Sequence, residues 1–351
     1  MVAAAEAVLP SPAYRPSAFT RLLSRIDALP LRGWWVFPAL AVVLVVWAHA
    51  VLWASGRLPV GSIDLFIVEG TFYAPYGLVM FAITNRIALR SLNAFWPATG
   101  WPDSDRALWA YRFVTLPRGL DLVALAIGIP VGIGALSSAP DAFLGAEQTR
   151  GSLALAYLPS LILGYTAFPL IVFQTVRQLR LVARIHREAT AIDPFDREPV
   201  YAFSRLTVVT GLAYLVIGYY GLAVNGAFQA GNLVSLGTLA ANFGVAMVAF
   251  IVPLWGIHDR LVDEKAKLMR EVEARLGRLG DEMYRRVDAG QFDGTKAVSD
   301  SIGGVAMLRD RIAKLPTWPW PPNVLRGFVT ALLLPVLVYV ASRLVGGNFG
   351  V

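Results

Sequence analysis

Runs of apolar residues, each about 20 residues long, recur along most of the 351-residue chain. A helix of that length spans the roughly 30 Å hydrocarbon core of a bilayer, because it rises about 1.5 Å per residue. The composition, 56% hydrophobic and 16% charged, agrees with this reading. The pattern predicts an all-α, polytopic integral membrane protein with about seven transmembrane helices. The expected spans are residues 34–55, 64–85, 119–138, 153–175, 206–226, 233–256 and 324–345.

One long segment, residues 257–322, has a different pattern, in which charged residues are frequent and separate the apolar ones. Its first half places apolar residues at spacings of three, four or seven, which is typical of one face of a helix. A second apolar stripe follows the break at residues 289–294. We expect a helical hairpin whose two stripes face each other. The first stripe includes Leu261, Leu268, Val272, Leu276, Leu279 and Met283, and the second includes Val298, Ile302, Val305, Leu308, Ile312 and Leu315.

These patterns divide the chain into four parts. The N-terminal tail contains a short amphipathic stretch, residues 17–28, which we expect to form a helix on the membrane surface. The six-span bundle, the hairpin and the seventh span follow. The four parts are the tail at residues 1–33, the bundle at 34–256, the hairpin at 257–322, and the seventh span with a short C-terminus at 323–351.

The basic residues lie on alternate sides of the expected spans. Of the 31 lysines and arginines, 28 fall in the tail and in every second connection, whereas Arg57, Arg150 and Arg343 fall on the opposite side. The positive-inside rule therefore places the N-terminus and the hairpin in the cytoplasm and the C-terminus outside. This distribution explains the net charge of +7 without a nucleic-acid partner. It also favours contact between the cytoplasmic face of the protein and the anionic lipids of the bilayer.

Composition and motifs narrow the class of protein. The chain has no cysteine, which excludes disulfide frameworks, thiolate metal ligands and cysteine nucleophiles. It also lacks HExxH, Walker A and GxSxG motifs, so we expect no enzyme, no cofactor and no metal site. Only 4 of the 31 basic residues are lysine, a bias typical of GC-rich bacterial coding. We therefore expect the protein in the plasma membrane of a bacterium, its inner membrane.

Two ionisable residues fall inside the first two expected spans. His49 and Glu69 each lie about six residues from the outer end of their span, or roughly 9 Å deep. Ionisable groups within a membrane are costly enough to mark candidate functional sites. A histidine beside a carboxylate can also titrate in the physiological range. The alternative is a second span that begins near Thr71, which leaves Glu69 among the lipid headgroups.

The connection from the hairpin into the last span alternates tryptophan with proline at Trp318 and Trp320. Proline restricts the backbone, so this link is stiff and could pass a movement from the hairpin to the span. The span itself is mostly apolar, with Thr330 and Tyr339 among its polar exceptions. A pore lined by this span would be a hydrophobic gate rather than a charged filter. The alternative is a passive anchor helix.

The layout of seven spans, a cytoplasmic N-terminus, cytoplasmic helix extensions and a final span after a returning helix resembles the topology of insect chemoreceptor channels. The Tyr-to-Gln motif of that family's last span is not matched, because the span here has Tyr339 but no glutamine, so no residue is carried over. We expect an oligomeric channel-like or sensory protein, a homo-oligomer whose subunits are joined through the hairpin. Two alternatives stay open: a non-catalytic structural or accessory subunit of a larger membrane complex, and a secondary transporter.

Overall fold

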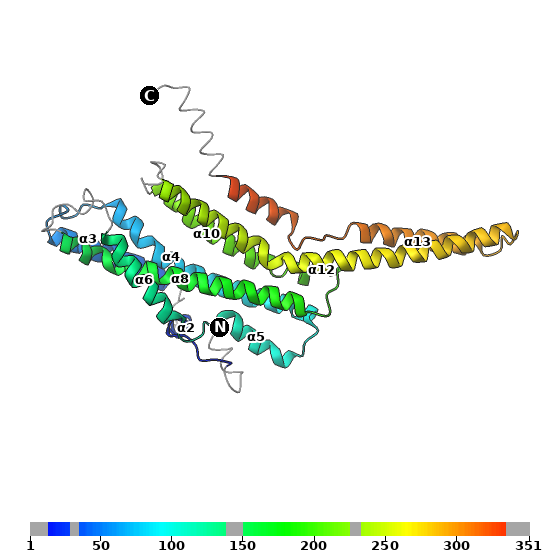
Figure 1. Cartoon of the computed structure of the whole chain (residues 1–351), viewed down its shortest axis with the longest axis horizontal. Coiled ribbons are helices and arrows are strands. Elements are labelled where there is room, and N and C mark those ends of the chain that lie inside the picture. The colour runs from blue at the N-terminus through cyan, green and yellow to red at the C-terminus, as the bar shows by residue number, and fades with distance from the viewer. Residues whose placement is uncertain (1–12, 29–34, 138–149, 225–232, 335–351) are drawn as a thin grey trace, which may run out of the picture.

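The computed structural model describes residues 13–28, 35–137, 150–224 and 233–334 (Figure 1). Within these ranges the chain is all-helical, which confirms the all-α part of the predicted fold class. The helices of the first half are α2 (Ala18–Asp27), α3 (Val36–Ala54), α4 (Leu65–Thr99), the short η2 (Asp103–Asp105), α5 (Arg106–Val114) and α6 (Leu120–Ser137). The helices of the second half are α8 (Arg150–Glu188), α9 (Arg197–Tyr201), α10 (Ser204–Val224), α12 (Leu233–Asp288) and α13 (Thr295–Ala313). A further helix, Pro322–Leu334, is here called the last helix.

Four helices in the described part of the chain are long and apolar enough to cross a membrane. They lie at Val36–Ala54, Gly151–Glu188, Arg197–Tyr220 and Asn242–Asp288, and they coincide with the first, fourth, fifth and sixth expected spans. The expected span 64–85 corresponds to the first part of α4, and the expected span 119–138 corresponds to α6. The expected span 324–345 begins in the last helix and continues beyond the described residues. The complete set of seven spans stays a prediction.

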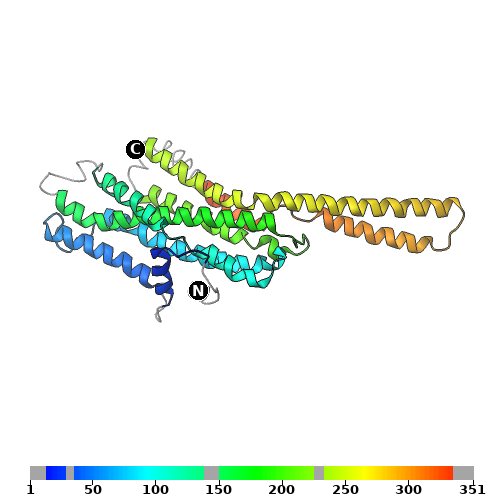
Figure 2. The same ribbon diagram turned by 60° about the horizontal axis from the view of Figure 1, so that its bottom comes forward.

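The bundle is organised around α8, which packs against α3, α4, α6 and α12. The pair α10 and α12 completes the bundle, and α10 also packs against α4 (Figures 1 and 2). The largest apolar cluster lies where α4, α5, α8, α9, α10 and α12 meet, and Phe95, Phe203 and Leu254 are among its buried members. These helices are held together by apolar side chains of the kind that the sequence pattern placed in the spans.

Glycine allows close approach between helices at two places in particular. A Cβ atom added at Gly128 of α6 would lie 2.7 Å from the backbone nitrogen of Thr166 in α8. One added at Gly211 of α10 would lie 2.6 Å from the ring of Phe328 in the last helix. Small residues at such contacts are a common way to pack membrane helices closely. By contrast, a Cβ at Gly244 of α12 would meet no atom within 4 Å.

The hairpin projects from one end of the bundle (Figures 1 and 2). Its first arm is the outer half of α12, which continues as one helix from the bundle to the turn. The turn contains Gly290 and Gly294, whose φ values of 67° and 82° lie in the left-handed region that favours glycine. The second arm, α13, then returns along α12. The amino group of Lys265 caps the end of α13 by donating to the carbonyl oxygens of Ala313 (2.7 Å) and Leu315 (2.9 Å).

The two arms of the hairpin meet through apolar side chains. A cluster with Val272, Ile312 and Leu315 at its buried centre joins α12 to the end of α13. Leu268, Leu276, Val305 and Leu308 are partly buried and pack against this centre. The other members of the first expected stripe lie elsewhere: Leu261 is buried in the core of the bundle, and Leu279 and Met283 are half-buried nearer the turn.

Candidate functional site

Buried amide side chains surround the point where α5 ends. Because α5 stops at Val114 and the chain runs extended before α6, its final carbonyl groups have no partner within a helix. Gln174 and Gln178 of α8 both donate to the carbonyl oxygen of Phe113, at 2.8 and 3.1 Å. Asn85 of α4 donates to the carbonyl oxygen of Val114 at 3.4 Å. The side-chain amide N–H groups therefore take the place of the backbone N–H groups that would bond these carbonyl oxygens if α5 continued.

The three amides also bind one another. The Oδ1 atom of Asn85 accepts from Nε2 of Gln174 at 2.6 Å and from Nε2 of Gln178 at 2.8 Å. All three side chains are buried. Hydrogen bonds in a region of low dielectric are strong and geometrically specific. In the described part of the chain, Oε1 of Gln174 is the one amide atom of this network that is buried without a partner. We call Asn85, Gln174, Gln178 and the two carbonyl groups of α5 the amide junction; it fixes α4, α5 and α8 relative to one another.

The N-terminal segment is tied to the chain that leaves this junction. The backbone N–H of Ser17 donates to the carbonyl of Leu116 at 2.9 Å, and the hydroxyl of Tyr14 donates to the carbonyl of Thr115, also at 2.9 Å. Arg177 of α8 contacts the Tyr14 hydroxyl. Burial raises the pKa of Tyr14 to about 12. The phenol therefore keeps its proton at neutral pH and remains able to donate this bond.

The helix α2 packs Phe19, Leu23 and Ile26 of its apolar face against the bundle, whereas Leu22 of the same face is 54% exposed. Leu23 is buried, and the ring of Phe19 meets that of Phe81 edge-on, with 4.9 Å between their centroids. Hydrogen bonding explains this placement, because Ser17 caps the helix and Thr20 accepts from the backbone N–H of Leu116 at 3.1 Å. Docking against α4 thus covers part of the apolar face of α2, and the place of this helix on the membrane surface stays a prediction.

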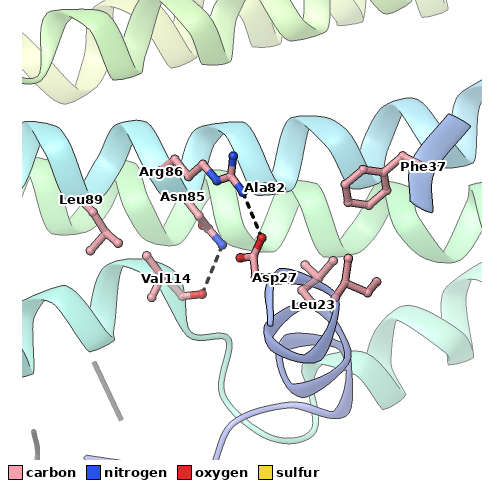
Figure 3. Close-up of a pocket in the computed structure, with 9 residues that line it drawn as sticks. Leu23, Asp27, Phe37, Ala82, Asn85, Arg86, Leu89 and Val114 are labelled. Carbon is pink, nitrogen blue, oxygen red and sulfur yellow. Dashed lines mark hydrogen bonds and ion pairs between the residues drawn. The ribbon is translucent and has the colours of Figure 1, made fainter. Parts of the chain in front are cut away.

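A small cavity lies between α2 and α4, beside the amide junction (Figure 3). Asn85 and Arg86 of α4 line it opposite Asp27 and Leu23 of α2, and Arg86 pairs with Asp27 at 3.1 Å. Its volume of about 20 Å³ suits roughly one water molecule. Pockets for organic ligands usually measure at least about 300 Å³. The junction is therefore suited to anchoring the N-terminal segment rather than to binding a substrate.

A stack of five rings connects the hairpin to the last helix. The successive centroid distances are 3.8 Å from His258 to Trp318, 5.2 Å to Trp320, 4.7 Å to Phe250 and 3.9 Å to Phe328. His258 and Phe250 belong to α12, the tryptophans to the link, and Phe328 to the last helix. We call this set the aromatic stack. Both tryptophans of the predicted link belong to it, between His258 of α12 and Phe328 of the last helix.

Beside the aromatic stack an apolar groove of about 300 Å³ separates part of the last helix from α12. The groove is lined by Met247, Phe250, Ile251, Trp255, Trp318, Trp320, Leu325, Phe328, Val329 and Leu332. The last helix is thus held firmly at Phe328, where it meets Gly211, and less closely along the groove. The predicted gate residue Thr330 is exposed on this helix, and Tyr339 lies outside the described residues.

Both ring nitrogens of His49 have backbone partners. The backbone N–H of Asp64 donates to Nε2 at 3.0 Å, which leaves Nδ1 to donate to the carbonyl oxygen of Val45 at 2.8 Å. His49 therefore ties α3 to the start of α4. The side chain of Glu69 lies outside the described part of the structure, so the His49–Glu69 pair stays a prediction.

The sequence pattern did not single out Asn85, Gln174 or Gln178, since Asn85 is far from the two glutamines along the chain. The signal that could have joined them is the spacing of Gln174 and Gln178, since residues four apart share one helix face. Among the described residues, no three His, Cys, Asp or Glu side chains lie together as the ligands of a metal ion would.

Comparison of the chain with protein-family models, with curated proteins and with solved structures gives no match. The functional proposal therefore depends on the residues of this chain alone.

Proposed function

We propose that this is a non-catalytic, channel-like or sensory membrane protein of seven spans. In this proposal its hairpin lies in the cytoplasm, joins the subunits of a homo-oligomer, and moves the last membrane helix. Four apolar helices compatible with a membrane support the location, and the one-sided distribution of basic residues supports the orientation.

The observation that carries the proposal is the double connection between the hairpin and the bundle. The first arm enters the bundle without a break, because α12 is one helix of 56 residues. The second arm is followed by the link that carries the two tryptophans of the aromatic stack. The stack ends at Phe328 of the last helix, whose ring centroid lies 3.9 Å from that of Phe250. A tilt or rotation of the hairpin is therefore passed to the last helix through aromatic side chains that contact one another. The groove of about 300 Å³ beside that helix leaves room for it to shift.

Exposed apolar side chains on the hairpin support its role in assembly. Tyr284, Phe292 and Met307 are 72%, 68% and 69% exposed, although they lie in the part of the chain expected to be in water. Large apolar side chains that stay exposed on a segment in water are available for contact with a protein partner. We assign these residues to a second copy of the chain.

The same exposure fits an accessory subunit that docks on a different protein. The facing stripes of α12 and α13 cover each other within one chain, so a partner is needed only for the smaller remaining surface. A purified particle that contains a single copy would favour this second candidate.

Reporter fusions test the membrane arrangement. A reporter inserted at Gly290 is expected in the cytoplasm, and one fused after Val351 is expected on the outer face, because 28 basic residues flank the inner side and 3 the outer. A reporter at the N-terminus serves as the control and should agree with the one at Gly290. If the Gly290 and Val351 reporters face the same side, the seven-span arrangement is wrong.

A further inference from the structure

Five arginines gather on one surface formed by α5 and α8. Four of them, Arg177, Arg180, Arg184 and Arg187, are spaced by three or four residues, so they form a stripe along one face of α8. Arg112 of α5 lies next to the stripe, since its carbonyl oxygen accepts from Nε of Arg177 at 3.0 Å. We call these five residues the arginine patch.

Little negative charge balances the patch. In the described part of the chain, its one recorded ion pair joins Arg184 to Glu188 at 2.7 Å, and both side chains are about half exposed. Exposed pairs of this kind are weak. Like charges three or four residues apart on a helix also repel one another. A bound anion would relieve this repulsion.

Two of the arginines converge on the same indole ring. The guanidinium carbons of Arg112 and Arg184 lie 5.6 and 5.7 Å from the ring centroid of Trp109. Trp101 stacks on Trp109, with 4.8 Å between the ring centroids, and helps to hold the indole ring in place. Trp109 itself is buried and fixed. The two cations, from different helices, are therefore held near each other on a rigid support.

The chemistry of this surface matches a phosphate group. Guanidinium groups present planar, paired N–H donors that fit phosphate oxygens, and they remain charged at any physiological pH. The patch also lies on the side of the bundle that the basic residues assign to the cytoplasm. Basic pockets between membrane helices at that level commonly bind the headgroups of anionic lipids.

We propose that the arginine patch binds a phosphate group, supplied either by the headgroup of an anionic phospholipid or by free phosphate. This site goes beyond the proposed role of the hairpin, and it requires neither the homo-oligomer nor the movement of the last helix.

Native mass spectrometry of the delipidated protein tests the site, with phosphatidylglycerol and phosphatidylcholine as probes. The wild-type protein should retain phosphatidylglycerol in preference to phosphatidylcholine. The double variant Arg112→Gln/Arg184→Gln should bind phosphatidylglycerol about thirtyfold more weakly, since each basic residue contributes about 1 kcal/mol to binding at an anionic surface. The control, Arg275→Gln/Arg278→Gln, removes the same charge from exposed positions of the hairpin and should bind as the wild type does.

Competition with inorganic phosphate separates the two sources of the ligand. Displacement of the lipid by millimolar phosphate would assign the site to the phosphate group itself. Retention of the lipid against phosphate, with loss in the Arg112/Arg184 variant, would assign it to a lipid headgroup. Equal retention by the patch variant and the hairpin control would overturn the proposal. Circular dichroism of each variant checks that its helices remain folded.

Discussion

Val272→Asp is expected to detach α13 from α12 while the bundle stays folded. Val272 is 3% exposed and packs against Ile312 and Leu315, the buried centre of the hairpin. The substitution places a carboxylate with no positive partner among apolar side chains, at a cost of at least about 3 kcal/mol. Trypsin should then cut α13 rapidly, because this helix contains Lys296 and Arg309.

A matched variant separates packing from charge in this experiment. Ala274→Asp introduces the same side chain two residues later, at an exposed position of the same helix. Its rate of cleavage in α13 should stay near that of the wild-type protein, since substitutions at exposed positions usually change stability by less than about 0.5 kcal/mol. Equal cleavage of the two variants would show that the two arms of the hairpin do not pack through Val272.

Asn85→Leu is expected to destabilise the bundle by about 2–4 kcal/mol, because it removes three hydrogen bonds between buried groups. The carbonyl oxygen of Val114 loses its donor from Asn85, and the amides of Gln174 and Gln178 lose their shared acceptor. Leucine has the same branching and number of side-chain heavy atoms as asparagine and a somewhat larger volume, so the substitution removes the hydrogen bonds without leaving a cavity. Thermal unfolding in detergent, followed by tryptophan fluorescence, measures the change.

The control for the amide junction lies on the same helix. Asn93 is exposed, and its side chain accepts one hydrogen bond, from Arg106 at 3.0 Å. Asn93→Leu should therefore lower the unfolding temperature much less than Asn85→Leu does. A similar loss in both variants would argue that the amide junction adds no specific stability.

The sequence predicted the helices because their hydrophobic periods are local properties of the chain. The hairpin is the clearest case: the spacing of Val272 and Leu276 indicated one helix face, and the charged residues opposite indicated the other. The four apolar helices follow from length and hydropathy in the same way. None of these features depends on knowing which helices are neighbours.

Contacts between helices could not be predicted by the same means. Asn85 and Gln174 are 89 residues apart, and only the packing of α4 on α8 brings them within 2.6 Å. Glycine spacing was similarly ambiguous. Gly128 and Gly244 both occur among small residues in apolar helices. A Cβ atom added at Gly128 would meet the backbone of a neighbouring helix, whereas one added at Gly244 would meet no atom within 4 Å. Likewise, the partners of His49 come from the backbone and leave no trace in side-chain patterns.

The mass of the purified particle, with and without residues 265–315, tests whether the hairpin joins subunits. The structure allows this deletion, because the amino group of Lys265 lies 2.9 Å from the carbonyl oxygen of Leu315, and a short Gly-Ser linker can replace the segment. The wild-type protein should form a homo-oligomer in detergent, and the deletion variant should have the mass of one folded chain. A wild-type monomer, or a deletion variant that keeps the oligomeric mass, would contradict assembly through the hairpin.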